Sequence, residues 1–182
     1  MTRLARLSLV VAVVAGCATT GELRYYTLDM SPSGQARPEY NLDLTRLHAA
    51  QALARSNILI KKTSTEIEYY AVDHWAAGVA DLVREKLESE FGEPERDRDV
   101  ILISGVVLAF EQVDVDGGAT AHIKLELEFR RANEGRTGDP LMKRTYEANL
   151  PAGTMEAGSV VRALSQGLEE VAVRIAEDTS AL

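Results

Sequence analysis

The side chains that most often perform catalysis are few and scattered along this sequence of 182 residues. The three histidines, His48, His74 and His122, fall in different predicted elements, and none has a metal-ligand or nucleophile spacing to another. No serine lies in a G-x-S-x-G turn, and the sequence has neither a P-loop nor a dinucleotide-binding fingerprint. We therefore expect no enzymatic activity, ATP hydrolysis included, and no cofactor.

One acidic pair invites comparison with a calcium site. Asp114 and Asp116 alternate ahead of Gly117 and Gly118, but the further oxygen ligands and the distal glutamate of an EF-hand loop do not follow. Two adjacent glycines are typical of a hairpin tip, where the backbone needs a positive φ. The sequence thus predicts a solvated turn here and no metal site.

The only cysteine, Cys17, has the clearest chemical role. Arg3 and Arg6 precede an apolar run over residues 7–15, about 9 residues long, whereas a membrane-spanning helix needs about 20. The run leads into Val-Ala-Gly-Cys at residues 14–17, which resembles the bacterial lipobox. That resemblance implies that residues 1–16 are a signal peptide and that the Cys17 thiol is acylated, with palmitate as a typical chain. We therefore expect a protein that is anchored to a membrane without spanning it.

The remaining sequence predicts a short lipidated tether, residues 17–23, and one domain, residues 24–182. Period-two alternation and turn residues predict strands, and apolar residues at helical spacing predict two helices. The first helix is expected to start with Asp73 as its cap and to run about 17 residues, to Gly92 and Pro94. The second is expected to have Thr154 or Ser159 as its cap. The predicted strands are 24–28, 40–44, 57–62, 66–70, 99–113, 119–131 and 141–150, with a helical turn at 48–55.

These elements predict an α+β fold: a two-layer domain in which two long amphipathic helices cover a mainly antiparallel sheet. Trp75 is expected in the core, because it is in register with Val79 and Leu82 on the first helix. The acidic residues that follow are expected to form a solvated face. They are Glu85, Glu88, Glu90, Glu93 and Glu95.

The charge balance argues against a nucleic-acid partner. The chain has 20 basic and 28 acidic residues, a formal charge of −8 at pH 7 and a pI of about 5.0. Binding to phosphate backbones requires clustered lysine and arginine residues. No such cluster is present in the sequence.

Several segments of the predicted domain resemble the ABC-type transport auxiliary lipoproteins, the PqiC-like family. The similarity rests on Asn57-Ile-Leu-Ile-Lys-Lys-Thr-Ser64, Glu66-Ile-Glu-Tyr-Tyr70, His74-Trp-Ala-Ala77, Asp81-Leu-Val83 and Tyr25-Tyr-Thr-Leu28. It implies a non-catalytic accessory subunit of an ABC/MCE-type lipid transport system that links the inner and outer membranes. The implied partners are an MCE-type substrate-binding protein and an ABC permease and ATPase complex, with phospholipid as ligand. A homo-oligomer is also expected, because MCE conduits are rings.

The residues after the cysteine bear on location. An aspartate in this place commonly retains bacterial lipoproteins in the inner membrane, whereas Ala18 and Thr19 follow Cys17 here. We therefore expect a lipid anchor at the periplasmic face of the outer membrane.

Two other functional classes stay open. One is an outer-membrane assembly lipoprotein that partners a β-barrel or the lipopolysaccharide machinery, which copurification with a β-barrel would favour. The other is a lipid-anchored hydrolase whose site is assembled from distant residues. A histidine and carboxylates gathered in a pocket would favour that class.

Overall fold

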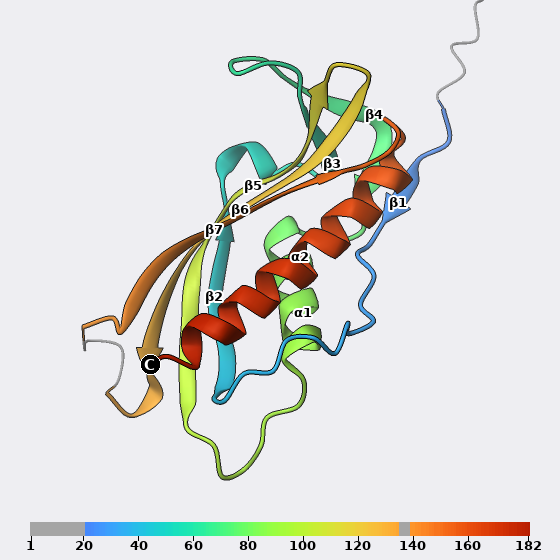
Figure 1. The fold of residues 1–182 in the computed structure, drawn as a ribbon. Coiled ribbons are helices and arrows are strands. Elements are labelled where there is room, and N and C mark those ends of the chain that lie inside the picture. Colours follow the sequence, from blue (N-terminus) through green and yellow to red (C-terminus); the bar gives the residue numbers. More distant parts are fainter. Residues whose placement is uncertain (1–20, 135–138) are drawn as a thin grey trace, which may run out of the picture.

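The computed structural model describes residues 21–134 and 139–182, so Cys17 and the predicted signal peptide lie outside the described residues. In these ranges seven strands and two α-helices build an α+β fold, as predicted (Figure 1). Neither helix is both long and apolar enough to cross a membrane. The elements are β1 (Arg24–Tyr26), β2 (Asn41–Ala49), η1 (Gln51–Leu53), β3 (Asn57–Lys61), β4 (Ile67–Trp75), α1 (Val79–Phe91), β5 (Val100–Val115), β6 (Gly118–Arg131), η2 (Ala132–Glu134), β7 (Met142–Pro151) and α2 (Ala157–Thr179).

The sheet is mixed, which corrects the prediction of a mainly antiparallel one. Its strand order is β1-β4-β3-β5-β6-β7, and β2 also pairs with β5. The pairs β1–β4, β2–β5 and β3–β5 are parallel, whereas β3–β4, β5–β6 and β6–β7 are antiparallel. The antiparallel pairs follow from turns that the sequence displays. The parallel pairs join strands that are distant in the chain, and no local signal reports them.

Strand β5 is long enough, at 16 residues, to have two neighbours on one edge. Its first half pairs with β2 over residues 100–107, and its second half pairs with β3 at Gln112 and Val113. On the other edge β6 follows β5 almost throughout, with one register shift at Leu108. The sheet therefore divides beside β5 into two branches.

Both helices lie on one face of the sheet (Figure 1). Helix α2 packs against β6 and β7, and α1 packs against β2 and α2. Alternate residues of β6 point into this layer and are fully buried, namely Ile123, Leu125, Leu127 and Phe129. This pattern is the half-buried strand expected from the alternation over residues 122–129.

The first helix begins later than predicted. Asp73 and Trp75 are the end of β4, paired with β1, and α1 starts at Val79 with Gly78 as its N-cap. Asp73 therefore caps no helix; its carboxylate is ion-paired with Arg24, at 2.7 Å between Oδ1 and Nε. The core position of Trp75 is confirmed, since it is 2% exposed and its ring lies 5.4 Å from that of Phe110.

The helix lengths and caps also differ from expectation. Helix α1 has 13 residues and α2 has 23, so only α2 is long. The N-cap of α2 is Glu156, without a side-chain cap bond, and neither Thr154 nor Ser159 has that role. Of the helical turn predicted at 48–55, only Gln51–Leu53 is helical, as a 3-10 turn. The predicted tip at Gly117 is confirmed, with φ of 82°.

The connection between β1 and β2 is held to the helices by a buried ion-pair cluster. Lys86 and Glu90, one turn apart on α1, have fully buried side chains and an Nζ–Oε1 distance of 2.6 Å. Lys86 Nζ also donates to Ser31 O and to Glu169 on α2, at 2.8 and 3.1 Å. Glu90 in turn accepts bonds from the Ser33 amide and hydroxyl. The acidic residues were predicted to form a mostly solvated face, and Glu90 is an exception to it, being buried.

Candidate functional site: a groove on the open face of the sheet

The face of the sheet away from the helices is only partly covered. Leu59 of β3 is 1% exposed there because the segment around η1 packs over this end, where Tyr69 Oη donates to the Ala52 carbonyl at 2.8 Å. Along β2, β6, β7 and the first half of β5, the described residues that point to this face are exposed or half-buried. The alternate residues of β6 that point to it are His122, Lys124, Glu126, Glu128 and Arg130.

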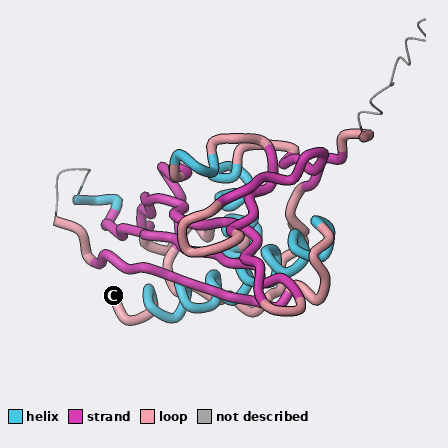
Figure 2. Tube along the Cα trace, turned by 90° about the horizontal axis from the view of Figure 1, so that it is seen from above, coloured by secondary structure: helices cyan, strands magenta, loops and turns pink. Residues whose placement is uncertain are grey.

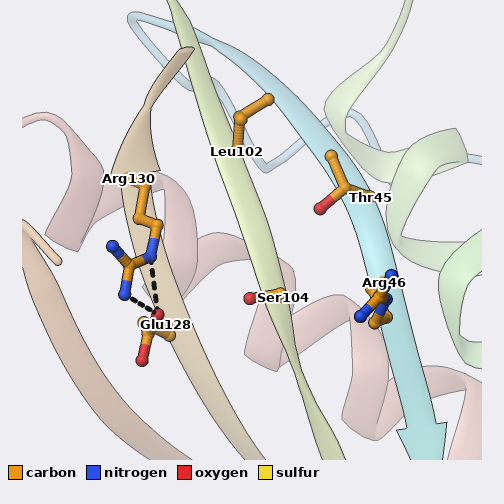
Figure 3. Close-up of a pocket in the computed structure, with 6 residues that line it drawn as sticks. All are labelled: Thr45, Arg46, Leu102, Ser104, Glu128 and Arg130. Atoms are coloured by element: carbon orange, nitrogen blue, oxygen red, sulfur yellow. Dashed lines mark hydrogen bonds and ion pairs between the residues drawn. The ribbon is translucent and has the colours of Figure 1, made fainter. Parts of the chain in front are cut away.

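A groove of about 340 Å³ runs across three of these strands. Figure 3 shows its lining: Thr45 and Arg46 from β2, Leu102 and Ser104 from β5, and Glu128 and Arg130 from β6. The strand register arranges most of them in two cross-strand rows. Arg46, Ser104 and Glu128 lie opposite one another in the first, and Leu102 lies opposite Arg130 in the second.

A bulge in β2 brings two neighbouring residues into the groove. The register between β2 and β5 shifts between Leu44 and Arg46, so Thr45 is the extra residue. Its hydroxyl donates to the Ile103 carbonyl at 3.2 Å, which fixes the bulge. Without the extra residue, alternation would turn Arg46 toward the helices. The bulge therefore places both Thr45 and Arg46 on the open face.

The close spacing of β5 and β6 beside the groove depends on Gly105. A Cβ atom at this position would lie 2.1 Å from the Glu126 carbonyl oxygen and 2.9 Å from a methyl group of Leu127. Such distances are shorter than any van der Waals contact. Only glycine therefore allows the two strands to hold the groove rows in register.

The groove is lined by one large apolar side chain, Leu102, and by charged side chains of which some form an ion pair and one does not. Arg130 is bound to Glu128, with Nη2 and Nε at 2.6 and 2.7 Å from Oε1. No ion pair within residues 21–134 and 139–182 involves Arg46, whose side chain is exposed. No histidine is among the residues that line the groove, and the carboxylate opposite Ser104, that of Glu128, is bound to Arg130. The groove thus presents an apolar contact beside two arginines, one of which is already bound to a carboxylate.

The histidines that the sequence analysis considered lie away from the groove. His122 lies between two carboxylates, with Nδ1 3.2 Å from Glu111 and Nε2 2.9 Å from Glu147. Its hydrogen bond to Glu111, helped by Glu147, raises the pKa of His122 despite partial burial. It lies six residues along β6 from Glu128, about 20 Å at 3.3 Å per residue. Both ring nitrogens are engaged with carboxylates, so His122 offers no free ring nitrogen.

The other two histidines are also apart from one another. His48 is exposed near the end of β2, and His74 has Nδ1 3.1 Å from the Ser56 hydroxyl. In the described part of the chain no three histidine, cysteine, aspartate or glutamate side chains are grouped as a metal site would require.

None of the groove residues was predicted as a site from the sequence. The sequence indicated one polar strand face, through the alternation with buried residues of Lys124, Glu126, Glu128 and Arg130. The pairing of β2 with β5, which brings Arg46 to Ser104, joins residues that lie far apart in the sequence. Cys17, the residue that the sequence did single out, lies outside the described residues.

Comparison with known structures supports the fold. Protein XCC0632 from Xanthomonas campestris, a DUF330 protein, is similar with a TM-score of 0.64 and 19% identity, over 87% of this chain and 92% of that one. The crystal structure of an uncharacterized protein is similar with a TM-score of 0.64 and 16% identity, over 87% and 99% of the two chains. Identities this low bear on the fold alone.

Comparison of sequences identifies the family. No curated protein matches the chain. The family model described as the ABC-type transport auxiliary lipoprotein component matches residues 26–176, which include every strand that lines the groove. The chain therefore belongs to the ABC-type transport auxiliary lipoprotein family.

Proposed function

We propose that this protein is a non-catalytic accessory subunit of an ABC/MCE-type lipid transport system that links the inner and outer membranes. The observation that carries the proposal is membership of the transport auxiliary lipoprotein family. Acylated Cys17 holds the domain at the periplasmic face of the outer membrane. The protein transfers no group and hydrolyses nothing; it binds the MCE-type conduit, as a homo-oligomer, and phospholipid passes between conduit and bilayer.

The groove on the open face is the surface that contacts the conduit. The buried centres of protein interfaces are more apolar than the rest of the surface and are enriched in arginine. Leu102 flanked by Arg46 and Arg130 offers that combination, and the surrounding cross-strand ion pairs offer a polar rim. Lys124 with Glu147 and Lys143 with Glu126, at 2.9 and 3.1 Å, are two of these pairs. Because Arg46 already faces outward on a fixed strand, binding requires little reordering of the groove.

A crosslinking experiment in the native envelope tests the proposal. A photoreactive residue at Ser104 is expected to capture an MCE-type protein, and Arg46→Glu is expected to reduce the crosslinked fraction severalfold. Arg162→Glu is the matched control, because Arg162 is an exposed arginine on α2, on the helix side of the domain. It should leave the fraction unchanged. The size of the crosslinked complex also reports whether several copies assemble.

Other results would redirect the assignment. If Ser104 captures a β-barrel protein instead, the outer-membrane assembly function replaces lipid transport. If Arg162→Glu weakens capture as much as Arg46→Glu, the groove is not the contact surface.

The anchor is tested separately. Cys17→Ser is expected to abolish labelling by an alkyne fatty acid and to release the protein from membranes. In density gradients the native protein is expected to sediment with outer-membrane markers. Persistent labelling of the Cys17→Ser variant would refute the acylation site. Sedimentation with inner-membrane markers would refute the location alone.

A further inference from the structure

The described chain begins very close to the predicted anchor. Gly21, the first described residue, is four positions after Cys17. An extended chain advances at most about 3.6 Å per residue, so Gly21 lies within about 14 Å of the acylated cysteine. Gly21 is also packed on the domain, because a Cβ placed on it would lie 3.0 Å from Val72 Cγ1 of β4. The surface next to Gly21 is therefore held near the lipid headgroups.

Large apolar side chains are exposed around this point. Leu23, directly before β1, is 52% exposed, and Tyr25 within β1 is 64% exposed. Met155, just before α2, is 49% exposed. They account for three of the six large hydrophobic side chains that are exposed in the described residues. Isolated apolar residues on a surface need no explanation, but a group beside a membrane anchor does.

Contacts between β1 and the start of α2 show that the three residues belong to one end of the molecule. The Met155 carbonyl accepts a bond from Tyr70 Oη at 2.5 Å, and a Cβ on Gly158 would lie 3.8 Å from the Tyr26 ring. Neighbouring residues of a strand point to opposite sides, so Tyr25 and Tyr26 do so in β1. Tyr26 faces the start of α2, where Met155 lies, and Tyr25 lies with Leu23 on the other side of β1. Figures 1 and 2 show this end, where the described chain begins, opposite to the C-terminus.

We propose that this end, formed by Leu23, Tyr25 and Met155, rests in the headgroup layer of the bilayer, and this rests on the acylation of Cys17 proposed above. Tyrosine suits such a layer, because its ring is apolar and its hydroxyl is wet. The charged groups nearby include Glu22, Glu156 and the Arg24–Asp73 ion pair. No basic cluster is present at this end, so the matching lipids are zwitterionic.

The opposite end of the domain has a different surface. The loop between α1 and β5 carries exposed charged residues, among them Glu93, Glu95, Arg96 and Asp97. Such residues remain hydrated. The end near Gly21 thus exposes apolar side chains and the opposite end exposes charged ones, as expected for a membrane-facing end and a solvated end.

Depth-dependent quenching of a fluorescent label tests the proposal on the full-length acylated protein. Because Cys17 is the only native cysteine and its thiol is consumed by acylation, an added cysteine is the only free thiol. Tyr25→Cys and Met155→Cys are labelled with an NBD dye and reconstituted into phosphatidylcholine vesicles that contain a brominated phosphatidylcholine. Asp97→Cys in the solvated loop is the matched control. Quenching at positions 25 and 155 is expected to exceed that at position 97 at least threefold.

Mass spectrometry of the same samples separates the two possible failures. If Cys17 is acylated and all three positions are quenched equally, the membrane-facing end is refuted while the anchor stands. If Cys17 is unmodified, the anchor is refuted and the membrane-facing end with it. A photoreactive residue at position 155 that captures a protein in cells, without lipid quenching, would assign this end to a protein partner instead.

Discussion

The buried cluster around Lys86 makes a quantitative prediction about stability. Replacing Lys86 with methionine keeps an unbranched side chain of similar length and removes the ammonium group. The Glu90 carboxylate, whose side chain is fully buried, then lacks its cation. Removing one partner of a buried ion pair costs about 3 to 5 kcal/mol. Lys86 Nζ has three acceptors, so the variant also leaves the Ser31 carbonyl and Glu169 without this donor.

Two features place the expected loss of unfolding free energy near the lower end of this range. Glu90 keeps the hydrogen bonds from the Ser33 amide and hydroxyl, at 2.9 and 2.6 Å. Glu169 is 28% exposed, so water can replace its contact with Lys86. We therefore expect Lys86→Met to lower the free energy of unfolding by about 3 kcal/mol. For a domain of this size that shifts the melting temperature by about 6 to 12 °C.

Urea denaturation at pH 7, followed by fluorescence, measures this loss. Trp75 is the only tryptophan and is buried, so its emission reports global unfolding. Lys143→Met is the matched control, because Lys143 is 58% exposed in its ion pair and should contribute less than about 1 kcal/mol. The double variant Lys86→Met, Glu90→Gln is expected to be more stable than Lys86→Met alone, since it contains no unpaired buried charge. A loss below about 1 kcal/mol for Lys86→Met, or strictly additive losses, would refute this reasoning.

Three further predictions concern the core, the open face and the β5–β6 ladder. Trp75→Ala should lower the free energy of unfolding by about 3 to 5 kcal/mol, measured by circular dichroism; an unchanged melting temperature would contradict its core role. His122 has a raised pKa in the folded protein, so its stabilisation is full below its unfolded pKa of about 6.5 and is lost as pH rises through the folded pKa. His122→Gln should therefore flatten the dependence of the urea midpoint on pH above about 6.5. Gly105→Ala should lower the free energy of unfolding by about 1 to 3 kcal/mol, because the added methyl group would clash with the backbone of β6. A wild-type melting temperature would show that β5 and β6 can move apart without a loss of stability.

The sequence predicted best the parts of the fold that neighbouring residues specify. Strands β5, β6 and β7 were predicted within two residues of their observed bounds, β6 from its alternation, and the tip between β5 and β6 follows from Gly117 with its positive φ. The start of α1 was wrong because Trp75, Val79 and Leu82 form an apolar stripe that fits a helix. The pairing of Trp75 with Tyr26 of β1 keeps it in a strand instead. Tertiary pairing overrode a local pattern, as it often does at element ends.

The sequence did not predict the groove or the buried cluster around Lys86, and the reasons differ. Arg46 and Ser104 become neighbours only through a parallel pair and a bulge, neither of which has a local signature. Lys86 and Glu90 have the spacing of an ordinary ion pair on a helix surface. Only the β1–β2 connection, lying over them through Ser31 and Ser33, makes the pair buried. Local sequence describes which charges can pair but not which of them water can reach.

The two branches beside β5 have a consequence for the order of folding. Strands β5 and β6 form a hairpin from one contiguous segment, so this pair can close early, within microseconds for a short turn. The edge of β5 that receives β2 and β3 is complete only after both earlier segments have returned to it. Because synthesis proceeds from the N-terminus, β1 to β4 emerge before their central template exists. During that interval their unpaired backbone groups are open to aggregation, so this half of the chain is the part that a chaperone would need to protect.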